Sequence, residues 1–250
     1  MSASGLPAAA AGRQRGEPFP VAVTFDDDLL SHVEEALPAL RDAGAPATFF
    51  LNASSLNGPH SFWWQRLQRA VERGAGWPPP AAGARGVREA GQRIEELAPP
   101  ARDELAEALL AEAGPDPADS GLRADGVRRL AEAGHGIGFH TRRHHRLTQL
   151  HGADLERELT DGRAELESLT GTPIDAIAYP HGRADARVAA AARAAGYRIG
   201  FTTHAEAVTE RSDPLLLGRV EAPYDSVAKL AARVAFVLGA ALVNGRKQRQ

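Results

Sequence analysis

Cysteine is absent from this chain of 250 residues, which also contains only one methionine. Without cysteine the protein cannot form disulfides, use a thiol nucleophile or bind a metal through thiolates. Any metal must therefore be bound by histidine and carboxylate side chains. Positive charge is not in excess either, because the formal net charge is −3. A nucleic acid is not an expected partner, since phosphate binding requires a surplus of lysine and arginine.

Long hydrophobic segments are also lacking. The longest apolar run, residues 234–243, has about half of the ~20 residues that a membrane-spanning helix requires, so we expect it in a helix over 226–243 that packs on the core. Residues 1–20 are rich in alanine, glycine, serine and proline and lack the continuous apolar stretch of a secretory signal. We therefore expect a cytoplasmic protein with a disordered segment at 1–18 and a basic tail at 245–250.

What the chain does contain is an alternation of short apolar runs and helical patterns. About six runs have the length of strands, which is too few for a complete eight-stranded barrel. The short connections favour parallel α/β architecture, so we expect one domain over residues 19–244 with a distorted or incomplete (β/α) barrel. The expected strands pass through Phe25 and cover 47–51, 136–139, 176–179, 199–203 and 215–220; the expected helices cover 31–43, 122–133, 154–169, 184–195 and 226–243.

Residues 57–121 interrupt this alternation. Proline-rich stretches lie here between charged, alanine-rich helical pieces, which predicts an insertion or lid of short helices. The region also holds two of the three tryptophans, Trp63 and Trp64. Their rings could stack on a sugar or anchor the inserted helix on the barrel, and the second role is the commoner one.

Polar clusters follow the expected strands at their C-terminal ends. They comprise Asp26 with Asp27, His140 with His144, residues 179–181 and residues 202–204. The C-terminal ends of parallel strands form the face that carries the active site in barrels and in open sheets. Four separate loops therefore predict one site at this face.

The two pairs differ in what they indicate. Adjacent Asp26 and Asp27 point in different directions from a strand end, which favours a division of roles: one binds a metal and the other transfers protons. Taken alone, the aspartates at 26–28 would instead indicate a solvated helix N-terminus. His140 and His144 are spaced to present both imidazoles to one Zn²⁺ ion, although the arginines between them also fit a basic surface turn.

Together and in this order, these segments resemble the polysaccharide deacetylase family, also called the NodB-homology or carbohydrate esterase family 4 domain. Residues 24–28 are similar to its first motif, Thr-Phe-Asp-Asp-Gly, except that Asp28 replaces the glycine. Residues 47–50 resemble its second strand and residues 134–144 its second motif. The resemblance covers 21–52 and 122 to about 220, outside the insertion.

This resemblance implies the roles of the paired residues. Asp26 would be the catalytic base, and Asp27, His140 and His144 would bind one divalent metal ion. Zn²⁺ is the expected ion, with Co²⁺, Ni²⁺ and Fe²⁺ as alternatives.

The third motif departs from the family pattern Arg-x-Pro-Tyr-Gly. Residues 178–182 read Ala-Tyr-Pro-His-Gly, closer to the Tyr-Pro-x-Gly form of the branch that acts in exopolysaccharide and capsule pathways. In the family a backbone N–H at this point helps to bind the oxyanion, and His181 could keep that role. The missing arginine would hold the base as a carboxylate, and we consider Arg183 and Arg142 as its replacements.

The late Leu-x-His motif, whose histidine protonates the leaving amine, is also missing from residues 215–220. His181 and His204 are the replacements that we consider. His32 is a further candidate for which a structural role is favoured. We assign catalytic roles to Asp26 and His181, and substrate contacts to Tyr179, Pro180 and Trp64.

The sequence thus predicts a metal-dependent hydrolase that removes an N-acetyl group from a sugar or polysaccharide and releases acetate. Its partner would be an N-acetylated saccharide or glycan. Hydrolysis of a formamido sugar or another linear amide is the alternative within the same chemistry. A non-catalytic carbohydrate-binding protein on a degenerate deacetylase fold is the alternative from another class, suggested by the altered third and late motifs. The oligomeric state is not predicted by the sequence.

Overall fold

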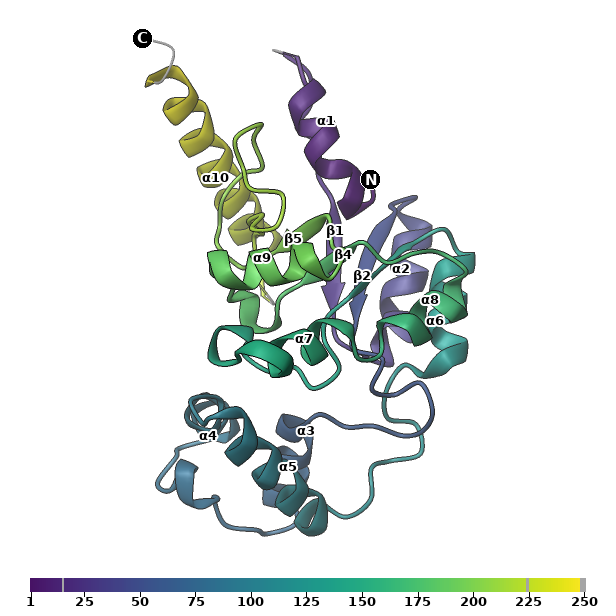
Figure 1. Ribbon diagram of the computed structural model, residues 1–250, viewed down its shortest axis with the longest axis vertical. Coiled ribbons are helices and arrows are strands. Elements are labelled where there is room, and N and C mark those ends of the chain that lie inside the picture. Colours follow the sequence, from purple (N-terminus) through teal and green to yellow (C-terminus); the bar gives the residue numbers. More distant parts are fainter. Residues whose placement is uncertain (15, 224, 248–250) are drawn as a thin grey trace.

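A curved parallel sheet forms the centre of the computed structural model, which describes residues 1–14, 16–223 and 225–247 (Figure 1). Its five strands lie in sequential order, and each is parallel to the next. They are β1 Val23–Asp26, β2 Ala47–Leu51, β3 Gly136–Phe139, β4 Ala176–Ala178 and β5 Ile199–Phe201. Parallel neighbours require crossover connections, which here carry helices. The sheet is a half-barrel, which confirms the expected incomplete (β/α) barrel.

The sixth expected strand, at 215–220, is a loop with one parallel bridge, between Phe201 and Leu217. Leu217 N–H donates to Gly200 O, and Thr202 N–H donates to Leu217 O, each at 2.8 Å. The loop therefore lies along β5 without extending the sheet further. This position brings the residues after Leu217 to the C-terminal end of the strands.

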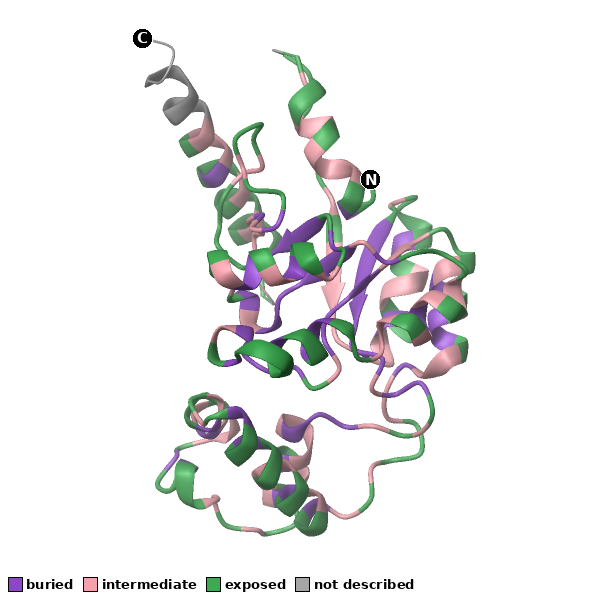
Figure 2. Ribbon diagram, in the orientation of Figure 1, coloured by how far each residue is buried: buried purple, intermediate pink, exposed green. Residues whose placement is uncertain are grey.

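Helices cover the outer face of the sheet, in which β2, β4 and β5 are buried and β1 is partly exposed (Figure 2). They are η2 His32–Ala36 with α2 Leu37–Asp42, α6 Arg123–Glu132, α7 Gly152–Thr160, α8 Arg163–Thr170 and α9 Ala186–Ala194. The single helix expected at 154–169 is divided, because Gly162 between α7 and α8 has a left-handed φ of 95°. The helix expected at 31–43 begins with a π-helical turn, η2, just before Pro38, which has no N–H to donate.

Alternating side chains on β2 contribute to a core on each face of the sheet. Phe49 and Leu51 belong to the large outer cluster beneath the helices, whereas Phe50 belongs to the inner cluster. Gly138 on β3 makes room for Phe50, because a Cβ there would lie 2.4 Å from the phenyl ring. The inner cluster comprises Ala3, Phe50, Ala176, Ala178, Ile199, Phe201 and Leu217.

The N-terminal segment differs from the disordered stretch expected at 1–18. It contains η1 Ala3–Gly5 and α1 Leu6–Gly12. Ala3 is fully buried in the inner cluster, and its N–H donates to Thr48 Oγ1 at 3.0 Å. The alanine run at 8–11 has high helix propensity, and Pro7 is suited to the first turn of a helix.

The C-terminal helix α10, Val227–Lys247, extends away from the sheet instead of lying flat on the core (Figure 1). Val237 is buried, but Phe236 is 78% exposed. Part of the basic tail expected at 245–250, residues 248–250, lies outside the described residues. No helix in the described parts of the chain combines the length and the apolar character needed to cross a bilayer.

The inserted region between β2 and α6 is a helical unit with a core of its own. It contains α3 Trp63–Glu72, η3 Pro79–Ala81, α4 Val87–Glu95 and α5 Pro99–Ala113. The buried residues of its core are Trp63, Leu67, Ala70, Ala81, Ala84, Ala90, Ile94, Leu109 and Ala113. Figure 1 shows this unit set apart from the sheet and joined to it by two long connections.

Candidate active site

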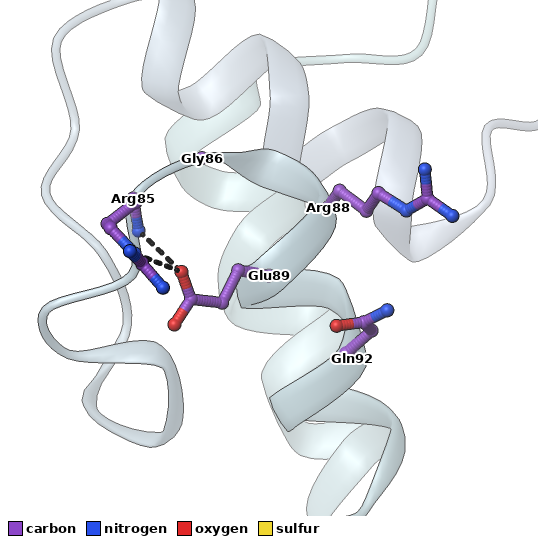
Figure 3. A pocket seen from close by; sticks show the side chains of 5 residues that line it. All are labelled: Arg85, Gly86, Arg88, Glu89 and Gln92. Carbon is purple, nitrogen blue, oxygen red and sulfur yellow. Dashed lines mark hydrogen bonds and ion pairs between the residues drawn. The ribbon is translucent and has the colours of Figure 1, made fainter.

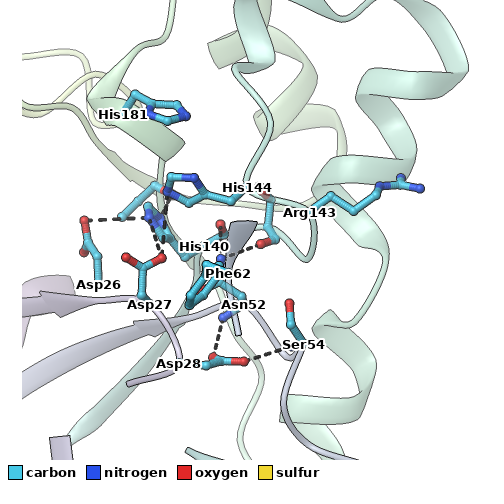
Figure 4. A network of polar contacts seen from close by, with 12 residues as sticks. Asp26, Asp27, Asp28, Asn52, Ser54, Phe62, His140, Arg143, His144 and His181 are labelled. Atoms are coloured by element: carbon cyan, nitrogen blue, oxygen red, sulfur yellow. Dashed lines mark hydrogen bonds and ion pairs between the residues drawn. The ribbon is translucent and has the colours of Figure 1, made fainter. Parts of the chain in front are cut away.

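Asp27, His140 and His144 come together beyond the C-terminal ends of β1 and β3 (Figure 4). Asp27 Oδ1 lies 3.8 Å from Nε2 of each histidine. One ligand atom from each of the three residues lies within 4.8 Å of the others. The structure thus brings together the three residues that the sequence nominated as metal ligands.

These donors fit a divalent metal ion. Ligands at 2.0–2.1 Å from a tetrahedral zinc ion are about 3.4 Å apart, close to the separations observed here. Asp27 Oδ1 is buried and has no hydrogen-bond partner among the described residues. An unpaired buried carboxylate oxygen is costly, and a bound cation would remove that cost. Three protein ligands also leave a coordination position open, as in catalytic zinc sites.

The protonation states of the three residues suit metal binding. His140 Nδ1 lies 2.7 Å from Ala178 O, and because a carbonyl can only accept, the proton must be on Nδ1 and Nε2 is left to bind a metal. Burial, together with His140 and His181, holds the pKa of His144 well below its usual value, so this ring is neutral. Burial raises the pKa of Asp27 to about 6, against the opposing effect of His140.

Asp26 forms a two-pronged ion pair with Arg219. Arg219 Nη1 donates to Asp26 Oδ1 at 2.7 Å, and Nη2 donates to Oδ2 at 2.8 Å. Arg219 is itself held by Thr24 Oγ1 at 3.3 Å and Thr202 O at 3.2 Å. Burial would raise the pKa of Asp26, but His140 and Arg219 outweigh it and the pKa is lowered. Asp26 is therefore a carboxylate at neutral pH.

The arginine that pairs with the base is Arg219, and neither of the two arginines considered as replacements for the one missing from the third motif. Arg183 is exposed, and Arg142 pairs with Glu165 at 2.5 Å. Arg219 belongs to the loop along β5, the segment from which the late Leu-x-His motif is missing. An arginine near the C-terminal end of an expected strand, the end that also carries the base in β1, was the signal that could have identified it.

Asp28, which stands where the family has glycine, is buried and does not face the metal group (Figure 4). Its carboxylate accepts four hydrogen bonds from the loop after β2. The donors are Asn52 N at 2.8 Å, Ser54 N at 2.8 Å, and Ser55 N and Oγ, both at 3.1 Å. Asp28 thus ties this loop to the end of β1.

His181 lies next to the metal group, in η5 Pro180–Gly182, where its φ is 58°. Its ring is 4.5 Å from the ring of His144, and Nδ1 lies 3.6 Å from Oε1 of Glu95 on α4. Burial and two nearby guanidinium groups lower the pKa of His181 to about 3. The ring is neutral at pH 7, which counts against its donating a proton as an imidazolium ion.

Tyr179 and Pro180 are both buried. The Tyr179 hydroxyl donates to Leu215 O at 2.9 Å, and burial raises the pKa of this phenol. The side chain belongs to the outer core. The side chain of Tyr179 therefore packs in the core and not toward the metal group, whereas the substrate contact expected of Pro180 stays a prediction.

The two tryptophans of the insertion have separate roles. Trp63 is buried in the core of the inserted unit, the anchoring role that is commoner for such residues. Trp64 is half-buried and reaches the site: its ring lies 5.3 Å from that of His144 and stacks on Phe62 at 4.4 Å. Trp64 thus lies beside the metal group, and the substrate contact expected of it stays a prediction.

The remaining candidate histidines lie outside the metal group. His204 is exposed. His32 is buried against the rings of Phe25 and Phe49, at 5.7 and 5.1 Å, and burial lowers its pKa to about 4. These contacts agree with the structural role favoured for His32.

A surface hollow on the inserted unit shares no residue with the site (Figure 3). Its lining consists of Arg85, Gly86, Arg88, Glu89 and Gln92. Glu89 pairs with Arg85 and Arg93 at i,i+4 spacing on an exposed helix face. This is an ordinary solvated helix surface rather than a second centre of chemistry.

Comparison with known proteins agrees with the geometry. The family model for polysaccharide deacetylase matches residues 13–77 and 91–200, so it also extends into both ends of the insertion. A search of curated protein sequences found no match.

Three solved structures illustrate the shared fold. The deacetylase PplD of Streptococcus pyogenes, in complex with acetate, is 18% identical with a TM-score of 0.60, over 93% of this chain and 78% of that one. IcaB from Ammonifex degensii is 20% identical with a TM-score of 0.61, over 93% and 80%. The deacetylase domain of BpsB from Bordetella bronchiseptica is 17% identical with a TM-score of 0.55, over 88% and 77%. With the family model matched over more than half of its length, this chain belongs to the polysaccharide deacetylase family.

Proposed function

We propose that this protein is a metal-dependent hydrolase that removes the N-acetyl group from a sugar unit of a saccharide or glycan. Family membership supports deacetylation of a sugar. The observation that carries the mechanism is the position of the Asp26–Arg219 pair beside the metal group: Asp26 Oδ2 lies 3.9 Å from His140 Nε2. A carboxylate held ionised next to a three-ligand metal site is the arrangement that metal-assisted hydrolysis requires.

Asp27, His140 and His144 would hold the metal, for which we propose Zn²⁺. When bound, the metal would polarise the amide carbonyl and make water a better nucleophile. Asp26 would take the proton from the attacking water, since its lowered pKa keeps it ionised and Arg219 fixes the direction of both oxygens. The charge that develops on the carbonyl oxygen would be met by the backbone N–H of His181, which lies in η5 next to the metal group.

Asp26, once protonated, is the group that we propose returns the proton to the leaving amine. His181 is neutral at pH 7, so a proton from its ring is a poor source. Its Nε2 is buried and lacks a hydrogen-bond partner in the described part of the chain. We propose that this nitrogen accepts a hydrogen bond from an N–H or O–H of the substrate, while the ring of Trp64 stacks on the sugar.

Acetate release from a panel of N-acetylated saccharides tests this function, with metal content measured on the same protein. We expect acetate release that stops when a chelator removes the metal and returns when Zn²⁺ is added. Formate release from formamido sugars, in the absence of acetate release, would favour the alternative amide substrate. Metal binding without hydrolysis of any member of the panel would favour a non-catalytic carbohydrate-binding protein.

A further inference from the structure

The loop that carries both histidine ligands is held by side chains from outside it. Residues 140–144 follow β3 and form no regular secondary structure, yet all five of their backbone carbonyls accept a side-chain hydrogen bond. Asn52 donates to the carbonyls of residues 140 and 141, at 3.1 and 2.7 Å, and Ser54 donates to that of residue 142 at 2.5 Å. Arg102 donates to the carbonyls of residues 143 and 144, both at 3.1 Å.

The loop has a conformation that needs such support. Thr141 has a φ of 58° and His144 a φ of 52°, in the left-handed region that residues other than glycine seldom adopt. Such a residue is strained and persists only where the surrounding structure imposes its conformation. Hydrogen bonds to consecutive carbonyls impose it here, since they fix the direction of each peptide group.

The two histidine ligands are oriented in different ways. His140 is fixed by the hydrogen bond from its Nδ1 to Ala178 O. Nδ1 of His144 is buried and has no partner among the described residues, so this ring lacks the hydrogen bond that usually orients a metal-binding histidine. What holds His144 is its backbone, through Arg102, and ring contacts with Phe62, Trp64, His140 and His181. Arg102 and Trp64 both come from the insertion.

Arg102 is a buried residue that binds the loop, and not a charge on the protein surface. It lies near the start of α5 and is 3% exposed. No ion pair within 4.0 Å involves it in the described structure, and its two hydrogen bonds go to adjacent carbonyls, which the rigid fork of a guanidinium can reach together. Burying this cation is costly: burial lowers the pKa of Arg102, although the carboxylates of Asp103, Glu158 and Glu95 oppose that effect.

The next residues of the loop are joined to the insertion as well. His145 Nε2 lies 2.8 Å from Oδ1 of Asp103, the neighbour of Arg102 on α5. Arg146 Nη1 donates to Glu96 Oε1 at 3.0 Å. The contact between the inserted unit and the sheet domain is therefore concentrated on the segment that carries the metal ligands.

We propose that Arg102 is a positioning residue for the metal ligand His144, which makes the inserted unit a structural part of the metal centre and not only a cover for the substrate. This inference rests on the proposed function, in that Asp27, His140 and His144 bind the metal. Arg102 touches neither metal nor substrate, so its effect must appear in metal affinity and ligand geometry before it appears in turnover.

Zn²⁺ affinity, measured by competition with a chromophoric chelator, and the visible absorption of the Co²⁺-loaded protein test the proposal. Arg102→Met removes both donors but keeps the length of the side chain. We expect a 10–100-fold weaker Zn²⁺ affinity, the usual effect of losing support around a ligand, together with an altered Co²⁺ spectrum. Arg102→Lys keeps the charge and can reach one carbonyl, so its affinity should lie between those of the wild type and Arg102→Met.

Arg69→Met is the matched control. Arg69 also lies in the inserted unit and is partly buried, but it pairs with Asp116 at 2.7 Å and does not contact the loop. We expect it to lower the melting temperature and to leave Zn²⁺ affinity unchanged.

Two results would overturn the role of Arg102 while leaving the proposed function intact. One is wild-type Zn²⁺ affinity and an unaltered Co²⁺ spectrum in Arg102→Met, or in Arg102→Lys if the methionine variant does not fold. The other is an equal loss of affinity in Arg69→Met, which would indicate general loosening of the insertion. If the wild-type protein itself binds neither metal, the proposed function fails and the inference fails with it.

Discussion

Arg219 binds both carboxylate oxygens of Asp26, at 2.7 and 2.8 Å, from a position 193 residues later in the chain. The loop along β5 thus supplies the cation that pairs with the base. In the family pattern, the arginine of the third motif has that role. The pair therefore joins the end of the first strand to the loop that lies along the last strand.

Removing this cation should change the pH dependence of the reaction. In Arg219→Met the pKa of Asp26 should rise, because a nearby positive charge that favours the carboxylate is lost. The acidic limb of the kcat/KM profile should move to higher pH. Arg183→Met, at an exposed position, should leave the limb in place. A limb that stays fixed in the Arg219 variant would show that the metal alone sets the pKa of the base.

Asp28 should matter for stability more than for chemistry. Asp28→Ala removes the acceptor of four hydrogen bonds and leaves buried N–H groups unpaired, so the free energy of unfolding should fall by about 2–4 kcal/mol. Urea denaturation measures this. Asp42→Ala, on an exposed aspartate, should change it by less than about 0.5 kcal/mol. Equal effects of the two substitutions would contradict the anchoring role of Asp28.

The raised pKa of Asp27 implies that the ionised side chain of this residue destabilises the metal-free protein. Its pKa rises from 3.8 in the unfolded chain to about 6 in the folded one. Ionisation of Asp27 therefore lowers the free energy of unfolding by at most about 3 kcal/mol above pH 6, and it has no such effect below pH 3.8. Metal-free Asp27→Asn should therefore melt at a higher temperature than metal-free wild type at pH 7.5. The difference should shrink as the pH is lowered toward 4.5. A lower melting temperature of the variant at pH 7.5 would contradict the assignment.

Of the two neighbouring tryptophans, Trp64 should contribute to substrate binding and Trp63 to the stability of the fold. Trp64→Ala should raise KM by about 2–10-fold with little change in kcat, as expected for the loss of one stacking contact. Trp63→Ala should lower the free energy of unfolding by about 3–5 kcal/mol, because it leaves a cavity in the core of the inserted unit. Steady-state kinetics and urea denaturation of both variants distinguish the roles. An unchanged KM in Trp64→Ala would remove it from the substrate site.

The convergence of Asp26, Asp27, His140 and His144 could be predicted because it depends on local sequence, whereas their separate roles are implied by the resemblance to the family and stay predictions. Asp26, Asp27 and His140 directly follow apolar runs, and the ends of parallel strands converge whatever the rest of the chain does. His144 follows by its spacing from His140. The half-barrel could be predicted for the same reason, since strand and helix patterns alternate with short connections.

What could not be predicted depends on contacts between distant segments. The Arg219–Asp26 pair exists because the loop along β5 packs beside the sheet, and no local pattern encodes that packing. Arg102 is 42 residues from the carbonyl of His144 that it binds. Tyr179 was assigned a substrate contact as part of the third motif, yet its side chain packs in the core.

Metal stoichiometry and turnover, measured together on Asp26→Asn and His140→Ala, test the central claim most directly, namely that Asp26 transfers protons beside a metal bound by Asp27, His140 and His144. We predict that Asp26→Asn keeps the metal and the fold while turnover falls about 10²–10⁴-fold, the usual contribution of general acid–base catalysis. His140→Ala should lose metal and activity together, whereas His145→Ala should keep the metal. Loss of metal from Asp26→Asn, or full metal occupancy in His140→Ala, would contradict the account.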